Sequence, residues 1–288
     1  MSSLIVNADD FGLTSGVNRA ILELHEAGLV TSTTLMARAE ATGDAVVLAQ
    51  AEPALGVGCH VVLVDGESVL PPAELPALAD QRTGRLRPTL GAFLKALFSG
   101  RIRAEEIEAE AAAQIASLQA RGIRLTHIDT HKHTHMFPAV LRPVLRAARA
   151  ASIRSVRNPF EPAWSLRATA GAPWVRRTEV RMLRAFEPAF RRIVAEEGFA
   201  TTDGAIGVLA TGTLDAATVN SLLGALPEGC YELVAHPGYN DEALQRAHTR
   251  LLSSREVERA ALASVRNAGH IELVSFAALG SQCPTAMI

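Results

Sequence analysis

Close to its start the chain reads Leu4-Ile5-Val6-Asn7-Ala8-Asp9-Asp10-Phe11-Gly12, an apolar strand-like run that leads directly into two adjacent carboxylates. Apolar residues at helical spacing follow, from a candidate N-cap at Ser15 to a glycine stop at Gly28. A strand followed at once by a helix is the unit from which parallel sheets are built. This opening segment therefore predicts an α/β fold.

The same alternation continues along the chain and predicts how the sheet closes. Strand-like runs recur at 4–6, 30–36, 55–64, 125–129, 153–156, 205–209, 231–235 and 271–276. Helical patterns lie at 15–28, 41–51, 93–98, 105–119, 138–150, 176–192, 216–226 and 256–268. This number of β-α units suits a TIM-barrel-like (β/α) barrel better than an open sheet. No G-x-G-x-x-G follows a strand, so a dinucleotide crevice is not expected.

Two segments interrupt the alternation. Residues 66–100 contain several prolines and glycines, and residues 158–204 contain both tryptophans and an arginine-rich stretch. Long excursions of this kind are often binding loops or lids. We expect one domain over residues 1–288, with insertions at about 66–100 and 158–204.

Composition narrows the function classes. The 288 residues carry a net charge of −2 with a pI near 6.5, so general nucleic-acid binding is not expected. No basic segment precedes an apolar stretch at the start, and no apolar run approaches the ~20 residues of a membrane-spanning helix. A cytoplasmic protein is the expectation.

Polar side chains gather where predicted strands end. Asp9 and Asp10 follow the first strand, and His60 closes Gly56-Val57-Gly58-Cys59-His60. A third group is His127-Ile128-Asp129-Thr130-His131-Lys132-His133-Thr134-His135, and His236 follows the strand at 231–235. In barrels the carboxyl ends of the strands meet at one rim, where catalytic groups collect. The four groups are therefore expected to share one site.

Each group also has a structural explanation. Asp9 and Asp10 alone fit a turn before a helix, and a histidine such as His60 in an apolar strand is more often a hydrogen-bonded core residue. The histidine cluster is a stronger signal, because residues two apart on an extended segment share a face. His131, His133 and His135 would then project together, with one as a metal ligand and the others binding substrate or orienting their neighbours.

One carboxylate with two imidazoles forms an oxygen and nitrogen ligand set. It suits zinc or magnesium first, and also manganese, cobalt or iron. Three protein ligands leave open positions, which is typical of a catalytic metal site. The metal would activate water and polarise the carbonyl under attack. We expect Asp9 to be the general base and His236 the general acid.

At these positions the chain resembles the YdjC-like (ChbG) carbohydrate deacetylase family. The matching motifs are the segment 6–13, Gly58-Cys59-His60, the segment 127–137 and His236-Pro237-Gly238-Tyr239, and they occur in family order. The resemblance implies a distorted barrel related to the polysaccharide deacetylases. It also implies removal of acetyl groups from N-acetylated sugars with one divalent metal ion. By motif position the metal ligands would be Asp10, His60 and His131, with Asp9 as the base. Relatives are often homodimers, and nothing in these residues decides how many chains assemble.

The chain is most similar to the hopanoid-biosynthesis-associated (HpnK-type) branch of that family. The run at 63–72 and the segment 158–200 carry this likeness, which implies N-acetylglucosaminyl hopanoid as substrate, with chitooligosaccharides as the alternative. Two positions depart from the family pattern: Cys59 replaces a larger apolar residue, and Lys132 replaces a histidine. Lys132 would add a cation beside the metal. Substrate binding is therefore assigned to Asp129, Lys132, His133 and His135.

Two other functions compete with this interpretation. A metal-dependent phosphoesterase would hold two metals ~3.5–4 Å apart and would need additional shared ligands. A non-catalytic sugar- or lipid-binding protein would not require both Asp9 and Asp10.

The arginines of residues 176–192 have two interpretations. They form either a solvated helix face or a peripheral contact with an anionic inner membrane. The interspersed Val180, Leu183, Phe186 and Phe190 would either complete the membrane-facing surface or pack on the barrel.

Overall fold

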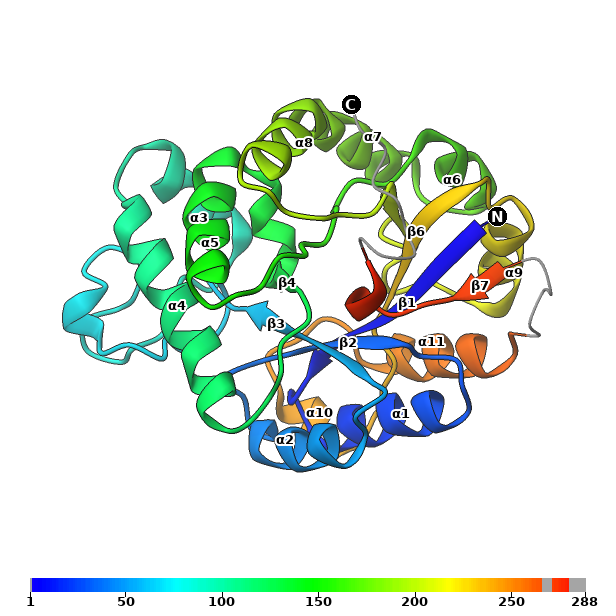
Figure 1. Cartoon of the computed structure of the whole chain (residues 1–288), viewed down its shortest axis with the longest axis horizontal. Helices are drawn as coiled ribbons and strands as arrows, with labels where there is room; N and C mark the ends of the chain where they lie inside the picture. Colours follow the sequence, from blue (N-terminus) through cyan, green and yellow to red (C-terminus); the bar gives the residue numbers. More distant parts are fainter. Residues whose placement is uncertain (1, 266–270, 280–288) are drawn as a thin grey trace.

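The computed structural model describes residues 2–265 and 271–279. Its strands are β1 (Ser2–Phe11), β2 (Ser32–Leu35), β3 (Gly56–Val61), β4 (Ile128–Thr130), β5 (Gly204–Ile206), β6 (Gly229–Ala235) and β7 (Ile271–Leu273). The α-helices are α1 (Ser15–Glu26), α2 (Thr42–Ala51), α3 (Leu90–Phe98), α4 (Ala104–Ala120), α5 (Pro138–Ala150), α6 (Ala163–Ala168), α7 (Trp174–Leu183), α8 (Glu187–Glu196), α9 (Ala216–Gly224), α10 (Glu242–Arg246) and α11 (Ser253–Ala263). Helices surround the strands on several sides in Figure 1. This confirms the predicted α/β barrel-like class.

All paired strands are parallel, in the order β4-β3-β2-β1-β6-β5. Between β4 and β5 the ring is continued by single parallel bridges, Ile128 to Val156 and Ser155 to Ala200. The strand expected at 153–156 is therefore reduced to these bridges, because its neighbours run alongside it for too few residues to form a ladder. A barrel with one weak side is the result.

Strand β1 is the centre of the sheet, and all of its residues are buried. Residues 2–8 of β1 pair with β6 on one edge. On the other edge β7 pairs with Ser2–Leu4 and β2 pairs with the later part of β1. Two strands thus share one edge, which distorts the barrel and leaves the carboxyl end of β1 buried at the rim.

The first excursion is anchored by helix α4. It contains the 3₁₀ helix η1 (Pro72–Glu74) and α3. Two buried glutamates of α4 accept its backbone amides: Glu110 accepts from residues 69 and 70, and Glu106 accepts from residues 77 and 78. A buried carboxylate is costly unless it is hydrogen-bonded. These bonds therefore fix the excursion to the helix that packs beside β3.

The sequence predicted one helix for the arginine-rich stretch 176–192, and this prediction is wrong. The stretch divides into α7, the 3₁₀ helix η3 (Arg184–Phe186) and α8. Val180 and Phe190 are buried, and Phe186 packs edge-on against Phe137. Val180, Phe186 and Phe190 therefore pack inward, as the second of the two interpretations expected, whereas Met182 of the same stretch is exposed.

The short helices α6 and α10 were not predicted, since neither carries enough periodic apolar residues to be recognised. The predicted helix at 256–268 is α11 in its described part, and residues 266–268 lie outside the described residues. Within 2–265 and 271–279, no helix combines the length and apolarity needed to cross a membrane.

Candidate metal centre

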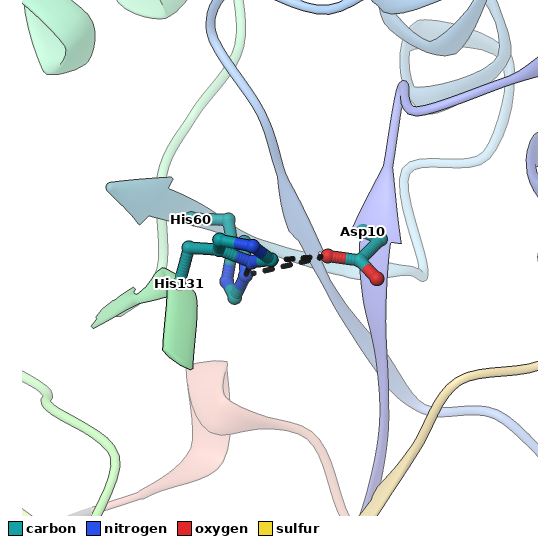
Figure 2. Close-up of side chains that lie close together, drawn as sticks. All are labelled: Asp10, His60 and His131. Atoms are coloured by element: carbon teal, nitrogen blue, oxygen red, sulfur yellow. Dashed lines mark hydrogen bonds and ion pairs between the residues drawn. The ribbon is translucent and has the colours of Figure 1, made fainter. Parts of the chain in front are cut away.

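Three side chains from separate strand ends meet at the rim of the barrel. Asp10 Oδ1 lies 3.5 Å from His60 Nε2 and 3.5 Å from His131 Nδ1, and the two imidazole nitrogens are 3.2 Å apart. Figure 2 shows the carboxylate of Asp10 facing both rings. Ligand atoms about 2.0–2.1 Å from a tetrahedral Zn²⁺ lie about 3.3–3.4 Å from one another. The three atoms therefore have the spacing of ligands around one cation.

The backbone at Asp10 turns the carboxylate toward the histidines. Asp10 has φ 66°, a left-handed conformation that non-glycine residues rarely adopt. The amide of Leu13 donates to the carbonyl of Asp10 at 3.0 Å, which closes a turn directly after β1. Local strain of this kind gathers at functional sites. The turn also directs Asp9 and Asp10 to different partners.

His60 is held by a carboxylate on its far side. Nδ1 of His60 donates to Asp129 Oδ1 at 2.8 Å, which leaves Nε2 free to face Asp10 and His131. A carboxylate behind a histidine is the usual arrangement at metal sites. Although burial favours the neutral ring, Asp129 raises the pKa of His60 to about 9. In the absence of a cation a proton occupies this ring.

The surrounding charges also fit a cation. Buried carboxylates outnumber buried guanidinium groups around the site: Asp9, Asp10, Asp129, Glu232 and Glu258 lie with Arg157 and Arg255. A divalent ion would balance part of this negative charge. The ligand set of one oxygen and two nitrogens is chemically suited to zinc and to other divalent metals.

Arg157 is a second centre of the site. Its Nη2 donates to Asp9 Oδ1 at 2.6 Å, its Nη1 to Asp9 Oδ2 at 2.8 Å and its Nε to Glu232 at 2.7 Å. Nη1 also donates to Asp129. Despite burial, this guanidinium holds the pKa of Asp9 below its usual range. Asp9, His60 and Asp129 also lie close enough to suggest a metal group, but Arg157 already supplies the positive charge there.

His236 stands beside Asp9 on the other side of the site. Its Nε2 is 3.8 Å from Asp9 Oδ2, and its Nδ1 is 3.6 Å from Glu258. The backbone amide of His236 donates to the same carboxylate of Glu258 at 2.6 Å. Burial opposes a charge on the ring, yet Glu258 raises the pKa of His236. The structure therefore places an imidazole with a raised pKa next to Asp9.

The histidine cluster is not extended. Residues His131–Met136 form a 3₁₀ helix (η2) in which Lys132 and His133 have φ 56° and 53°. The three histidines therefore do not share one face, contrary to expectation: only His131 reaches the ligand group. A left-handed pair depends on tertiary contacts, which an alternating pattern does not reveal.

The four residues assigned to substrate binding have different surroundings. Asp129 and His135 are fully buried, and His135 bonds Thr130 and the carbonyl of Arg157, so neither is exposed to a substrate here. Lys132 donates to Asp65 at 2.5 Å. His133 is partly exposed, and its buried Nδ1 has no hydrogen-bond partner in the described part of the chain. Of the four, His133 and Lys132 are partly exposed, whereas Asp129 and His135 are buried and bonded within the protein, and substrate binding by all four stays a prediction.

Sequence reasoning missed Arg157, Arg255, Glu232 and Glu258. Arg157 directly follows the weak strand at 153–156, so its position at a strand end was a usable signal. Glu232 is an acid inside an apolar strand, which also marks a buried partner. Arg255 and Glu258 lie on α11, where charged residues are ordinary, and no local signal separates them from surface residues.

Two named proteins are similar to this chain over part of its length. A protein from Brevibacillus brevis named carbohydrate deacetylase is 45% identical over 157 residues, which is 54% of this chain and 59% of that protein. A chitooligosaccharide deacetylase from Salmonella schwarzengrund is 39% identical over 175 residues, covering 58% of this chain and 66% of that one. The matched part is thus less than two thirds of either relative.

A solved structure is similar over nearly the whole chain. It is a protein from Enterococcus faecalis V583, provisionally named a cellobiose-phosphate cleavage protein, with a TM-score of 0.74 and 25% identity. The match covers 96% of this chain and 97% of that one. The YdjC-like protein family matches residues 3–272, a range that includes every residue of the site and all of the strands except their outermost residues Ser2 and Leu273. The chain belongs to the YdjC-like protein family.

Proposed function

We propose that this protein is a metal-dependent carbohydrate N-deacetylase, which removes the acetyl group from an N-acetylated amino sugar. One observation carries the proposal: Asp10, His60 and His131 present three ligand atoms 3.2–3.5 Å apart, beside Asp9 and His236. The relatives named carbohydrate deacetylase and chitooligosaccharide deacetylase support the same chemistry.

A bound divalent ion would polarise the amide carbonyl and lower the pKa of water. The side chains supply the proton transfers. Arg157 keeps Asp9 ionised, so its carboxylate can accept a proton from the attacking water. His236, which Glu258 keeps basic, can give a proton to the departing amine. Asp9 Oδ2 and His236 Nε2 lie 3.8 Å apart, so the two roles fall on neighbouring groups.

The proposed substrate is N-acetylglucosaminyl hopanoid, on the likeness of 63–72 and 158–200 to the hopanoid-associated branch. Chitooligosaccharides are the second candidate, supported by the name of the Salmonella relative. The two differ in the group attached to the reacting sugar, which is a lipid in one and another sugar in the other. The same site chemistry would serve both.

The two remaining functions predict different properties. A phosphoesterase with two metals would need a second ligand group, and Arg157 fills the neighbouring group that could have served. A binding protein would have no use for Asp9 in proton transfer. Metal stoichiometry and the behaviour of an Asp9 variant therefore separate these functions from the deacetylase.

The direct experiment measures acetate release from N-acetylglucosaminyl hopanoid and from chitobiose, with metal removed by chelation and then restored. The restored protein is expected to bind one metal per chain and to release acetate from at least one substrate. Asp9→Asn should keep the metal but lose about 10²–10⁴-fold in turnover, because its base is gone. Asp215→Asn, an exposed N-cap on α9, is the control and should behave as wild type.

Failure to release acetate from either substrate with any restored metal would contradict the proposal. Two metals per chain would favour the phosphoesterase instead. Loss of metal in Asp9→Asn would mean that the roles of the two aspartates are exchanged.

A hopanoid substrate lies in a membrane, and α7 is the proposed contact. Trp174 and Met182 are 77% and 70% exposed on this helix. Arg176 and Arg177, by contrast, donate to backbone carbonyls within the protein, so their guanidinium groups are directed toward the protein. Presenting the hopanoid in vesicles tests the idea: Trp174→Ala should slow release from vesicles and leave release from chitobiose unchanged. If Trp174→Ala and wild type release acetate from vesicles at equal rates, α7 is not the membrane contact.

A further inference from the structure

Arg255 is a buried cation that the proposed chemistry does not use. It lies on α11, has no exposed surface and donates through Nη2 to Asp10 Oδ2 at 2.6 Å. Its Nε donates to the carbonyl of Leu251 at 3.1 Å, which fixes the plane of the guanidinium group. A buried arginine is costly without an anionic partner. Asp10 is that partner.

The two oxygens of Asp10 thus have separate tasks. Oδ1 faces His60 and His131 at 3.5 Å each, whereas Oδ2 is bound by Arg255. A carboxylate that binds a cation through both oxygens would need both on the cation side. The hydrogen bond from Arg255 holds one of them away, and the left-handed turn at Asp10 sets the same orientation.

The motif His236-Pro237-Gly238-Tyr239 makes room for this contact. A Cβ on Gly238 would stand 3.0 Å from Cδ of Arg255 and 3.1 Å from Cγ2 of Val17. The amide of Gly238 also donates to the carbonyl of Arg255 at 3.3 Å. A side chain at this position would press on Arg255 of α11 and Val17 of α1, so glycine suits the close approach of this motif to both helices. The motif therefore serves Asp10 as well as His236.

We propose that Arg255 is a positioning residue that leaves Asp10 only one oxygen for the cation, and so keeps coordination positions open for water and substrate. The inference rests on the proposed metal-dependent function. In this proposal, helix α11 controls how Asp10 of β1 binds the cation. Loss of Arg255 would free Oδ2 to join Oδ1 at the ion and raise the coordination number.

Cobalt substitution tests this without a turnover assay. Wild-type protein, Arg255→Met and Arg255→Lys are loaded with Co²⁺, and the visible spectrum and the Co²⁺ affinity are recorded. Low-coordinate Co²⁺ absorbs more strongly than high-coordinate Co²⁺. Arg255→Met should therefore show visible bands weaker by about twofold or more, together with affinity about 10–100-fold lower, as expected when a partner of a ligand is lost.

Arg259→Met is the matched control, since Arg259 lies one turn further along α11 and stacks over Tyr239. Its spectrum should equal that of wild type. Circular dichroism shows whether Arg255→Met folds. If it does not, Arg255→Lys is used instead, because lysine retains the charge but has a single donor group. Its spectrum should lie between those of wild type and a protein without the contact. An unchanged spectrum in the folded variant would overturn the inference. Absence of Co²⁺ binding in wild type would instead overturn the proposed function.

Discussion

Adjacent aspartates can do different work because neighbouring side chains leave a strand in opposite directions. Asp9 turns inward to Arg157, which binds both of its oxygens. Asp10 turns outward at a left-handed backbone and meets two histidines. The pair Asp-Asp in the sequence indicated two roles. The resemblance assigned one role to each aspartate, and the structure adds the partners, such as Arg157, that lie far away in the sequence.

If the proposed site binds a metal ion, we expect His60 to make its affinity depend on pH. Asp129 raises the pKa of His60 to about 9, so the metal-free ring carries a proton at neutral pH. The cation requires the neutral ring, so affinity should fall about tenfold for each pH unit below 9, and about one proton should be released per metal bound at pH 7.5. Calorimetry in buffers of different ionisation enthalpy measures this release.

Asp129→Asn is the informative comparison for that titration. It removes the charge that raises the pKa of His60, so proton release at pH 7.5 should fall well below one. An affinity that stays constant between pH 7 and 9 in wild type would contradict the role given to His60.

At the scale of elements, the long periodic segments were predictable and the short ones were not. Seven of the eight predicted strands are found, since apolar runs between turn residues are local signals. The turn η2 was missed, because its left-handed residues are stabilised by nonlocal bonds such as the one from Lys132 to Asp65. For the same reason the sequence did not reveal that His133 and His135 lie outside the group formed by Asp10, His60 and His131.

Thr130 holds η2 together through one hydroxyl. Its Oγ1 accepts from the amide of His135 and from Thr134, each at 2.9 Å, and bonds Nδ1 of His135 at 2.8 Å. Thr130→Val keeps the shape but leaves these buried groups unpaired. The free energy of unfolding should fall by about 1–3 kcal/mol in urea denaturation. Thr178→Val, on the exposed part of α7, should change it by less than about 0.5 kcal/mol. Equal effects would show that the hydroxyl of Thr130 does not stabilise the turn.

For the whole molecule, the weakest side of the barrel carries its strongest charge network. The segment that replaces a strand between β4 and β5 ends at Arg157, whose guanidinium reaches Asp9 on β1, Asp129 on β4 and Glu232 on β6. Backbone pairing is sparse there, so side chains connect the strands across the interior. Sequence patterns predict strands one at a time and do not show such a link.

Arg157→Met should therefore destabilise the entire fold. Removing one partner of a buried ion pair costs about 3–5 kcal/mol, and here three carboxylates lose the same cation. Arg157 holds the pKa values of Asp9 and Asp129 below 3.8, so their stabilisation is present above that pH and is lost as the pH falls through the folded values. Burial raises the pKa of Glu232 from 4.5 to about 7, so this carboxyl group destabilises the fold increasingly as the pH rises between these two values.

The loss of unfolding free energy in Arg157→Met should consequently be larger at pH 8 than at pH 5. At pH 5 the unpaired carboxylates of the variant can take up protons. Urea denaturation with chelator present measures this loss free of metal binding. Arg154→Met is the control: it lies in the same segment but is exposed, and it donates only to backbone carbonyls. A penalty no greater than that of Arg154→Met, or one independent of pH, would mean that backbone pairing and apolar packing alone hold this side of the barrel.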